Sequence, residues 1–180
     1  MEAKTFGDKK IIVRTLKNSD LKNAKRWMKY INDLIVEDAK LLMCGKATMK
    51  DEIAFLNKML KGMKIKNLIY LFAEDGDRVI AGATIELGRM RRNHIGGFGI
   101  AVSSGYRGIG LGKHLMAEII KLAKTDLNPK PKMIELSVYA NNKPAIGLYK
   151  KMGFKQVAKL PKQMQWKGKL VDEFVMIKYL

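Results

Sequence analysis

Residues 99–116 read GIAVSSGYRGIGLGKHLM, and this stretch decides the fold. An apolar run ends at Val102, a glycine-rich turn follows, and a helix-like run continues from Leu111. Glycines alternate at positions 108, 110 and 112, where a bare backbone can approach an anion closely and point several N–H groups at it. The N-terminus of the following helix adds a partial positive charge, and Arg107 and Lys113 add full charges. The stretch therefore predicts a pyrophosphate-binding loop.

Two common phosphate loops do not fit this stretch. A Walker A loop requires G-x-x-x-x-G-K-[S/T], but Arg107 occupies the first glycine position and His114 follows Lys113. A Rossmann fingerprint requires G-x-G-x-x-G, and counting from Gly108 places Lys113 at the last position. The loop therefore belongs to neither class.

Strand and helix patterns alternate on both sides of the loop. Before it, apolar and β-branched runs predict strands at 10–16, 67–74, 78–87 and 94–102, with helices within 20–43 and over 48–61. After it, the pattern predicts a helix at 111–125, a strand at 132–139, a helix at 143–152 and strands at 154–160 and 170–179. This order predicts an α/β protein with a mixed sheet.

Composition sets further bounds. The 180 residues suit a single domain over 1–180. The single cysteine, Cys44, rules out a disulfide framework and a cysteine-based zinc site, and is expected to be a free buried thiol. No run approaches the roughly 20 apolar residues of a membrane span, and the N-terminus lacks the apolar core of a signal peptide, so we expect a cytoplasmic protein. The net charge of +18 favours polyanionic partners.

The motif Arg107-x-x-Gly110-x-Gly112 resembles the acetyl-CoA loop of the GCN5-related N-acetyltransferase (GNAT) superfamily, R/Q-x-x-G-x-G/A. The downstream segment 141–154 is similar to the second cofactor motif of that superfamily, N-x-x-A-x-x-x-Y-x-x-x-G-F. The matching residues of this second motif are Asn142, Ala145, Tyr149, Gly153 and Phe154. The resemblance implies a mostly antiparallel sheet of about six or seven strands, flanked by helices, with a splay between the central strands.

The resemblance also implies an acetyl-CoA site, residue by residue. Main-chain groups of Ile100, Ala101 and Val102 are expected to bond the pantetheine arm, and Asn142 to contact it. Arg107 is expected to help main-chain N–H groups hold the pyrophosphate. These N–H groups come from Gly108, Ile109, Gly110, Leu111, Gly112 and Lys113. Tyr149 is expected near the thioester sulfur.

The implied chemistry is direct attack of a primary amine on the thioester, with main-chain N–H near Val102 stabilising the oxyanion. Tyr149 is predicted to be the general acid for the CoA thiolate. The base stays open between Glu135, Glu86, His94 and water. Relatives that acetylate ribosomal protein N-termini carry a glutamate where this chain has Ser137.

The acceptor amine also stays open, between a small polyamine-like molecule and a peptide or protein amine. Asp33, Glu37 and Asp38 would attract a cationic amine, whereas Arg89, Arg91 and Arg92 would attract an acidic peptide, nucleic acid or a ribosome.

Other hypotheses follow from the same features. The basic charge is compatible with a nucleic-acid- or ribosome-binding module, but the aromatic-and-basic motifs of RNA readers are missing. A CoA-binding sensor without catalysis is a further alternative, against which the intact Tyr149 argues. His114 is expected to be a surface or packing residue, and the exposed edges of the last strands are compatible with a homodimer.

Overall fold

The computed structural model describes residues 3–43 and 45–180, so the prediction of a free buried thiol at Cys44 lies outside the described residues. The strands are β1 (Lys4–Phe6), β2 (Lys9–Thr15), β3 (Leu68–Asp75), β4 (Arg78–Leu87), β5 (Ile95–Val102), β6 (Met133–Tyr139), β7 (Lys155–Trp166) and β8 (Lys169–Tyr179). The α-helices are α1 (Lys25–Val36), α2 (Met49–Lys64), α3 (Leu111–Asp126) and α4 (Lys143–Lys151). Short 3-10 turns are η1 (Asn18–Asn23), η2 (Met90–Arg92) and η3 (Ser104–Tyr106).

All described strands lie in one eight-stranded sheet, in the order β1-β2-β3-β4-β5-β6-β8-β7. The pairing is antiparallel except between β5 and β6, which run parallel. The expected mixed, mostly antiparallel sheet is confirmed. It has one strand more than expected, because β1 forms a hairpin with β2 through Gly7 at a φ of 61°.

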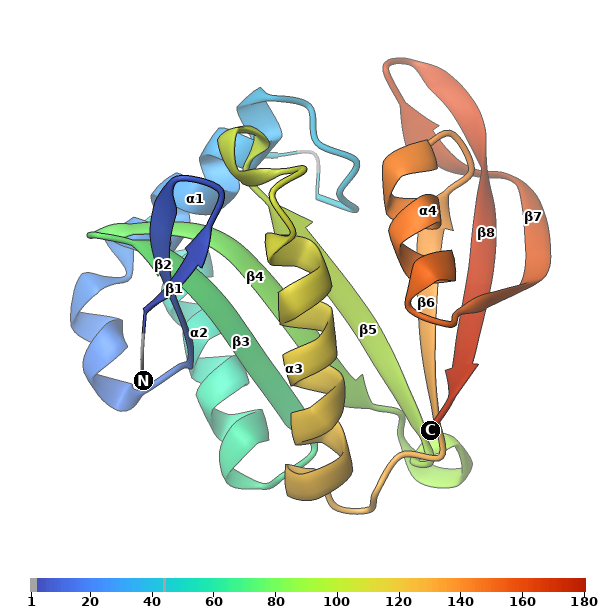
Figure 1. Cartoon of the computed structure of the whole chain (residues 1–180), viewed down its shortest axis with the longest axis horizontal. Helices are drawn as coiled ribbons and strands as arrows, with labels where there is room; N and C mark the ends of the chain where they lie inside the picture. Colours follow the sequence, from blue (N-terminus) through green and yellow to red (C-terminus); the bar gives the residue numbers. More distant parts are fainter. Residues whose placement is uncertain (1–2, 44) are drawn as a thin grey trace.

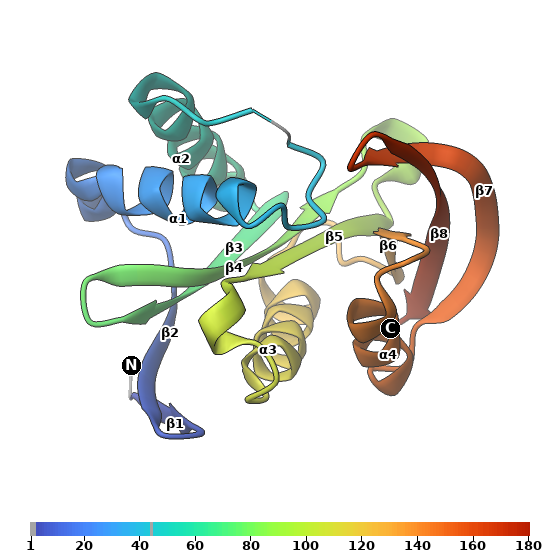
Figure 2. The ribbon, with the colours of Figure 1, turned by 90° about the horizontal axis from the view of Figure 1, so that it is seen from above.

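The helices cover the sheet on two faces, α1 and α2 on one and α3 and α4 on the other (Figures 1 and 2). Each face has its own apolar core. Leu115, Met116 and Ile119 of α3 pack in one core, and Trp27 and Leu56 of α1 and α2 pack in the other. Strand alternation supplies both cores from the same strands, which is why the central strands β3 and β4 are buried along most of their length.

Strands β5 and β6 separate soon after they meet. They pair only from Ile95 opposite Met133 to Gly97 opposite Glu135, whereas β5 continues to Val102 and β6 to Tyr139. The expected splay between central strands is therefore present, and Figure 1 shows the two strands diverging toward the loop before α3. Among the residues that the structure describes, no helix is long and apolar enough to cross a membrane.

Candidate functional site

The predicted phosphate loop forms an open turn at the start of α3. Gly108 and Gly110 adopt φ angles of 79° and 88°, which side chains other than glycine rarely accept. A Cβ atom at either position would meet nothing within 4 Å. Gly110 is the N-cap of α3. Because glycine has no side chain, it cannot cap the amides of the first turn. These free N–H groups and the helix dipole face an open space suited to an anion.

Arg107 braces this loop against the end of β5. Its Nε donates to the carbonyl oxygen of Val102 at 2.7 Å, and its Nη2 bonds a carboxylate oxygen of Glu37. The guanidinium therefore has two protein partners, and its contact with a phosphate stays a prediction. Lys113, on the first turn of α3, is exposed.

The main chain of β5 alternates between two neighbours. The Ser103 N–H donates to the Ile80 carbonyl at 2.9 Å, and the register pairs Ala101 with Gly82 of β4. In antiparallel pairing, every second residue directs its N–H and C=O away from the partner strand. Ile100 and Val102 therefore face the splay. The carbonyl of Ala101 faces the other way and accepts a bond from the Tyr30 hydroxyl at 2.8 Å, so the expected contact of Ala101 with a cofactor arm does not fit this register.

Tyr149 lies on α4, on the α3–α4 face of the splay. Its ring contacts Phe98 of β5 and Phe154, with centroid distances of 6.3 and 6.1 Å. Burial raises the pKa of Tyr149 to about 12, and its hydroxyl has no hydrogen bond to any group in the described part of the chain. The phenol therefore keeps its proton at neutral pH. Asn142 caps α4, because its Oδ1 accepts from the Ala145 N–H at 3.4 Å.

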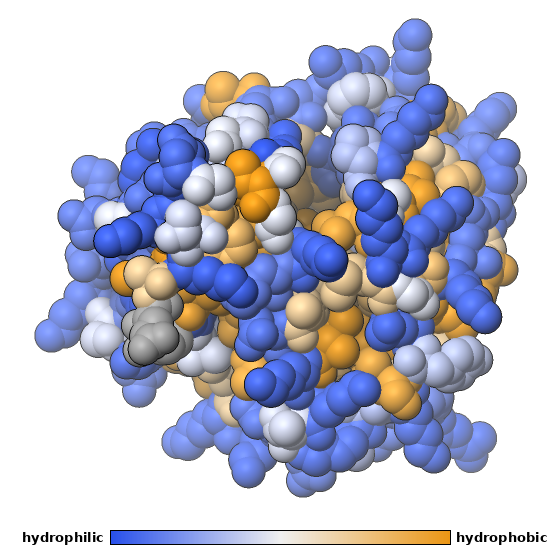
Figure 3. Space-filling model, in the orientation of Figure 1, coloured by the Kyte–Doolittle hydropathy of each residue, from blue (hydrophilic) through white to orange (hydrophobic). Residues whose placement is uncertain are grey.

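A hollow opens on this side of the molecule. Figure 3 shows it between the loop that precedes α3 and helix α4, with apolar residues on its walls and a hydrophilic surface around it. The hollow lies over the divergence of β5 and β6 seen in Figure 1. The hollow therefore lies where β5 and β6 no longer pair.

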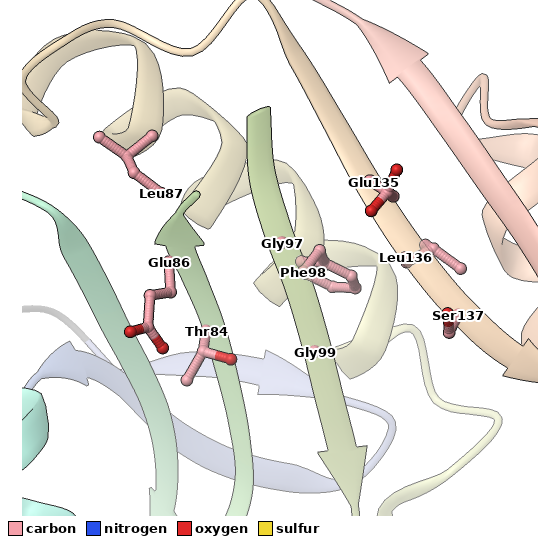
Figure 4. A pocket seen from close by; sticks show the side chains of 9 residues that line it. All are labelled: Thr84, Glu86, Leu87, Gly97, Phe98, Gly99, Glu135, Leu136 and Ser137. Atoms are coloured by element: carbon pink, nitrogen blue, oxygen red, sulfur yellow. The ribbon is translucent and has the colours of Figure 1, made fainter. Parts of the chain in front are cut away.

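A second feature, named here the acceptor-side cavity, lies across the sheet and has a volume of about 490 Å³. Figure 4 shows its lining side chains on three adjacent strands: Thr84, Glu86, Leu87, Gly97, Phe98, Gly99, Glu135, Leu136 and Ser137. Gly97 and Gly99 form a floor without side chains. They pair with Glu86 and Thr84 of β4, and Gly97 also pairs with Glu135 of β6.

Two of the predicted base candidates meet in this cavity. Glu86 and Glu135 stand on opposite sides of the glycine floor, and Ser137 lies two residues beyond Glu135. His94 precedes β5 outside the cavity, with its carbonyl bound to the Lys132 N–H at 2.8 Å. His114 packs against Phe6 at a centroid distance of 5.3 Å, and burial lowers its pKa, which confirms its packing role.

The other charged candidates have partners that the sequence did not reveal. Asp33 pairs with Lys29, Glu37 with Arg107, and Asp38 with Lys167. Each of these carboxylates therefore already has a cationic partner within the protein. Asp33 and Glu37 instead line a separate cavity of about 540 Å³ beside η3.

Two ion pairs border the acceptor-side cavity, and sequence reasoning missed both. Lys58 Nζ lies 2.9 Å from Glu86 Oε2, and Arg92 Nη2 lies 2.9 Å from Glu135 Oε1. The partners are 28 and 43 residues apart in the chain, so no local sequence pattern predicts these ion pairs.

Residues 38–154 match the model of the Acetyltransferase (GNAT) family. An L-amino acid N-acetyltransferase from Escherichia coli K12 is 38% identical over 103 residues, which make up 57% of this chain and 62% of that protein. The chain therefore matches less than two thirds of that relative.

Solved structures share the fold. A GNAT-family acetyltransferase from Streptococcus pneumoniae has a TM-score of 0.82 at 24% identity, over 95% of this chain and all of that one. A putative acetyltransferase from Salmonella typhimurium, solved with its cofactor acetyl-CoA, has a TM-score of 0.78 at 17% identity, over 94% of each chain.

Proposed function

Because the chain belongs to the Acetyltransferase (GNAT) family, we propose that it transfers an acetyl group from acetyl-CoA to a primary amine. One observation carries the proposal: β5 and β6 separate beyond Gly97. The anion loop and Tyr149 lie on one side of this opening, and the acceptor-side cavity lies on the other. A donor and an acceptor can therefore meet at the strand edge without competing for one pocket.

The residues present fit acetyl-CoA. The glycine loop has room for a pyrophosphate, since side chains at Gly108 and Gly110 are absent and a Cβ there would point into open space. The amides of 108–113 would hold the two phosphates. Main-chain groups of Ile100 and Val102 would hold the pantetheine arm, and the Asn142 carboxamide would contact it. When bound, acetyl-CoA supplies an acetyl thioester.

Acetyl transfer forms one bond, breaks another and requires two proton transfers. The neutral amine nitrogen forms a bond to the acetyl carbon, and the bond from that carbon to sulfur breaks. The N–H of Val102 is available to stabilise the carbonyl oxygen, because the register with β4 directs it away from that strand and toward the splay. The proton of the amine must go to a base, and the departing thiolate must receive one from an acid.

Tyr149 is the proposed acid. Its hydroxyl has no hydrogen-bond partner within residues 3–43 and 45–180, and its raised pKa of about 12 keeps it protonated before transfer. Glu86 and Glu135 are the proposed proton acceptors, acting directly or through water, because both line the acceptor-side cavity. The structure gives no such support to His94.

The test compares Tyr149→Phe with the unmodified protein, with release of free CoA as the readout. We expect turnover to fall at least tenfold, in line with the contribution of general acids, while CoA raises the melting temperature of both proteins alike by mass action. Tyr179→Phe, at the exposed end of β8, is the matched control. Unchanged turnover in Tyr149→Phe would reject the acid, and no thermal shift at millimolar CoA would reject the whole proposal.

A further inference from the structure

The charges around the acceptor-side cavity come in pairs of opposite sign. Glu86 on β4 holds the ammonium of Lys58 from α2, and Glu135 on β6 holds the guanidinium of Arg92 from η2. The cavity lining therefore carries two carboxylates, and each is paired with a cation that lies outside the lining. A cavity built only for a cation would leave its carboxylates unpaired.

The two kinds of charge lie at different depths. The side chains of Lys58 and Arg92 are 61% and 65% exposed, whereas those of Glu86 and Glu135 are 41% and 34% exposed. The carboxylates thus line the cavity and the cations stand at its rim. Ion pairs this exposed contribute about 0–1 kcal/mol, so a ligand that offers equivalent charges can replace either partner at little cost.

The charge of the whole chain disfavours a polycationic acceptor. A net charge of +18 repels polyamines at long range, and such a molecule would then have to pass Lys58 and Arg92. The expected polyamine-like acceptor is therefore the less favoured of the two.

We propose that the acceptor-side cavity binds a zwitterion: an L-amino acid whose ammonium lies between Glu86 and Glu135 and whose carboxylate is held by Arg92, with Lys58 as a second contact. This inference rests on the proposed acetyl transfer and deepens it. The bare floor at Gly97 and Gly99 lets the amine approach the strand edge. The planar guanidinium suits a carboxylate because it can donate two parallel hydrogen bonds. A volume of about 490 Å³ suits a small molecule.

The test separates the carboxylate from the amine. Free CoA release is measured for a panel of L-amino acids and their amides, for example leucine and leucinamide, and for spermidine. We expect kcat/KM for at least one amino acid to exceed that of its amide tenfold or more. Intrinsic reactivity cannot produce this preference, because the amide has the less basic amine and hence more of it neutral at pH 7.5.

Variants then test which residue causes the preference for the amino acid over its amide. Arg92→Gln is expected to lower kcat/KM for the amino acid about tenfold, through KM, and to leave the amide within twofold. Lys58→Gln should have a smaller effect in the same direction. Arg91→Gln, the neighbour in the same turn, should change neither substrate, and melting temperatures check that all variants fold.

Other outcomes overturn the inference. A protein that binds CoA and acetylates amides or spermidine at least as well as every amino acid contradicts the zwitterion but keeps the acetyl transfer. A protein that binds CoA and acetylates no member of the panel contradicts the amino acid acceptor. Equal losses for acid and amide in Arg92→Gln would show a merely structural role. Failure of CoA to bind at all would instead reject the proposed function.

Discussion

Glu52 is a buried acid that the proposed chemistry leaves unused. It lies on the first turn of α2 and is 6% exposed, and its carboxyl group has no hydrogen bond or ion pair with another residue that the structure describes. Burial, with a smaller contribution from the charge of Asp51, raises its pKa to about 7. The folded protein therefore holds a proton there that the unfolded chain releases near pH 4.5.

This shift predicts how stability depends on pH. A raised carboxyl pKa leaves stability intact below pH 4.5 and removes it as the pH rises to about 7. The loss is on the order of 3–4 kcal/mol, from about 1.4 kcal/mol for each pKa unit between 4.5 and about 7. Glu52→Gln cannot ionise, so we expect it to match the unmodified protein at pH 4 and to exceed its stability at pH 8. Urea unfolding midpoints at both values measure the difference.

The control for this prediction is Glu118→Gln on α3, which should show no comparable gain at pH 8. A Glu52→Gln protein that gains nothing between pH 4 and pH 8 would contradict the shift. If the prediction holds, the protein with Glu52 has a lower free energy of unfolding at neutral pH than the Glu52→Gln protein.

At the scale of elements, the turn into α3 is the segment on which cofactor binding depends. Gly110 has a φ of 88°. A residue with a Cβ atom is less stable by about 1–2 kcal/mol in this left-handed conformation. In Gly110→Ala we expect the free loop to relax out of this conformation, so that binding must restore it. The dissociation constant for CoA should then rise about tenfold, as 1.4 kcal/mol requires, while the melting temperature without CoA changes little.

Gly105→Ala is the matched control, since a Cβ there also meets nothing within 4 Å and its φ is not in the left-handed region. Calorimetric titration with CoA measures both variants. Equal CoA affinity for Gly110→Ala and the unmodified protein would show that the loop does not need its left-handed glycine.

Local patterns predicted most elements, because each has a strong local cause. The apolar and β-branched run at 78–87 predicts β4 with both ends correct, and the helix predicted over 48–61 is α2, which Thr48 caps by accepting from the Asp51 N–H. Strand β7 runs six residues beyond its predicted end at Leu160. Pro161, lysines and a register shift between Leu160 and Met164 obscure its pattern. The same features discourage pairing at an exposed sheet edge, and the homodimer stays a prediction.

Long-range pairing could not be predicted in this way. The carboxylate of Glu74 on β3 accepts bonds from Arg14 of β2 and Arg26 of α1, which are 60 and 48 residues away in the sequence. The ion pairs at the acceptor-side cavity have the same character. The glycine loop and Tyr149 could be predicted because motifs define them, whereas Lys58 and Arg92 became relevant only when folding brought them to Glu86 and Glu135.

At the scale of the molecule, the proposed site residues lie on both faces of the sheet, on either side of the splay. Tyr149 and the anion loop belong to the α3–α4 face, and Glu86 and Glu135 to the face that α2 covers. Gly97, Phe98 and Gly99 connect the two, because Phe98 packs on Tyr149 while the glycines form the cavity floor. The proposed proton donor and the proposed proton acceptors thus lie on opposite faces of the sheet and meet only where β5 and β6 separate.

The net charge of +18 bears on the donor more than on the acceptor. CoA carries a diphosphate and a further phosphate, so its attraction to a basic protein is screened as the Debye length falls from about 10 Å at 0.1 M salt to about 3 Å at 1 M. We expect KM for acetyl-CoA to rise severalfold between 50 and 500 mM NaCl. S-acetylpantetheine presents the same thioester without phosphates, so its KM should hardly change. An equal rise of KM with salt for both donors would mean that salt acts on the fold rather than on the attraction between phosphate and protein. A KM for acetyl-CoA that does not change with salt would mean that the basic surface has no role in binding acetyl-CoA.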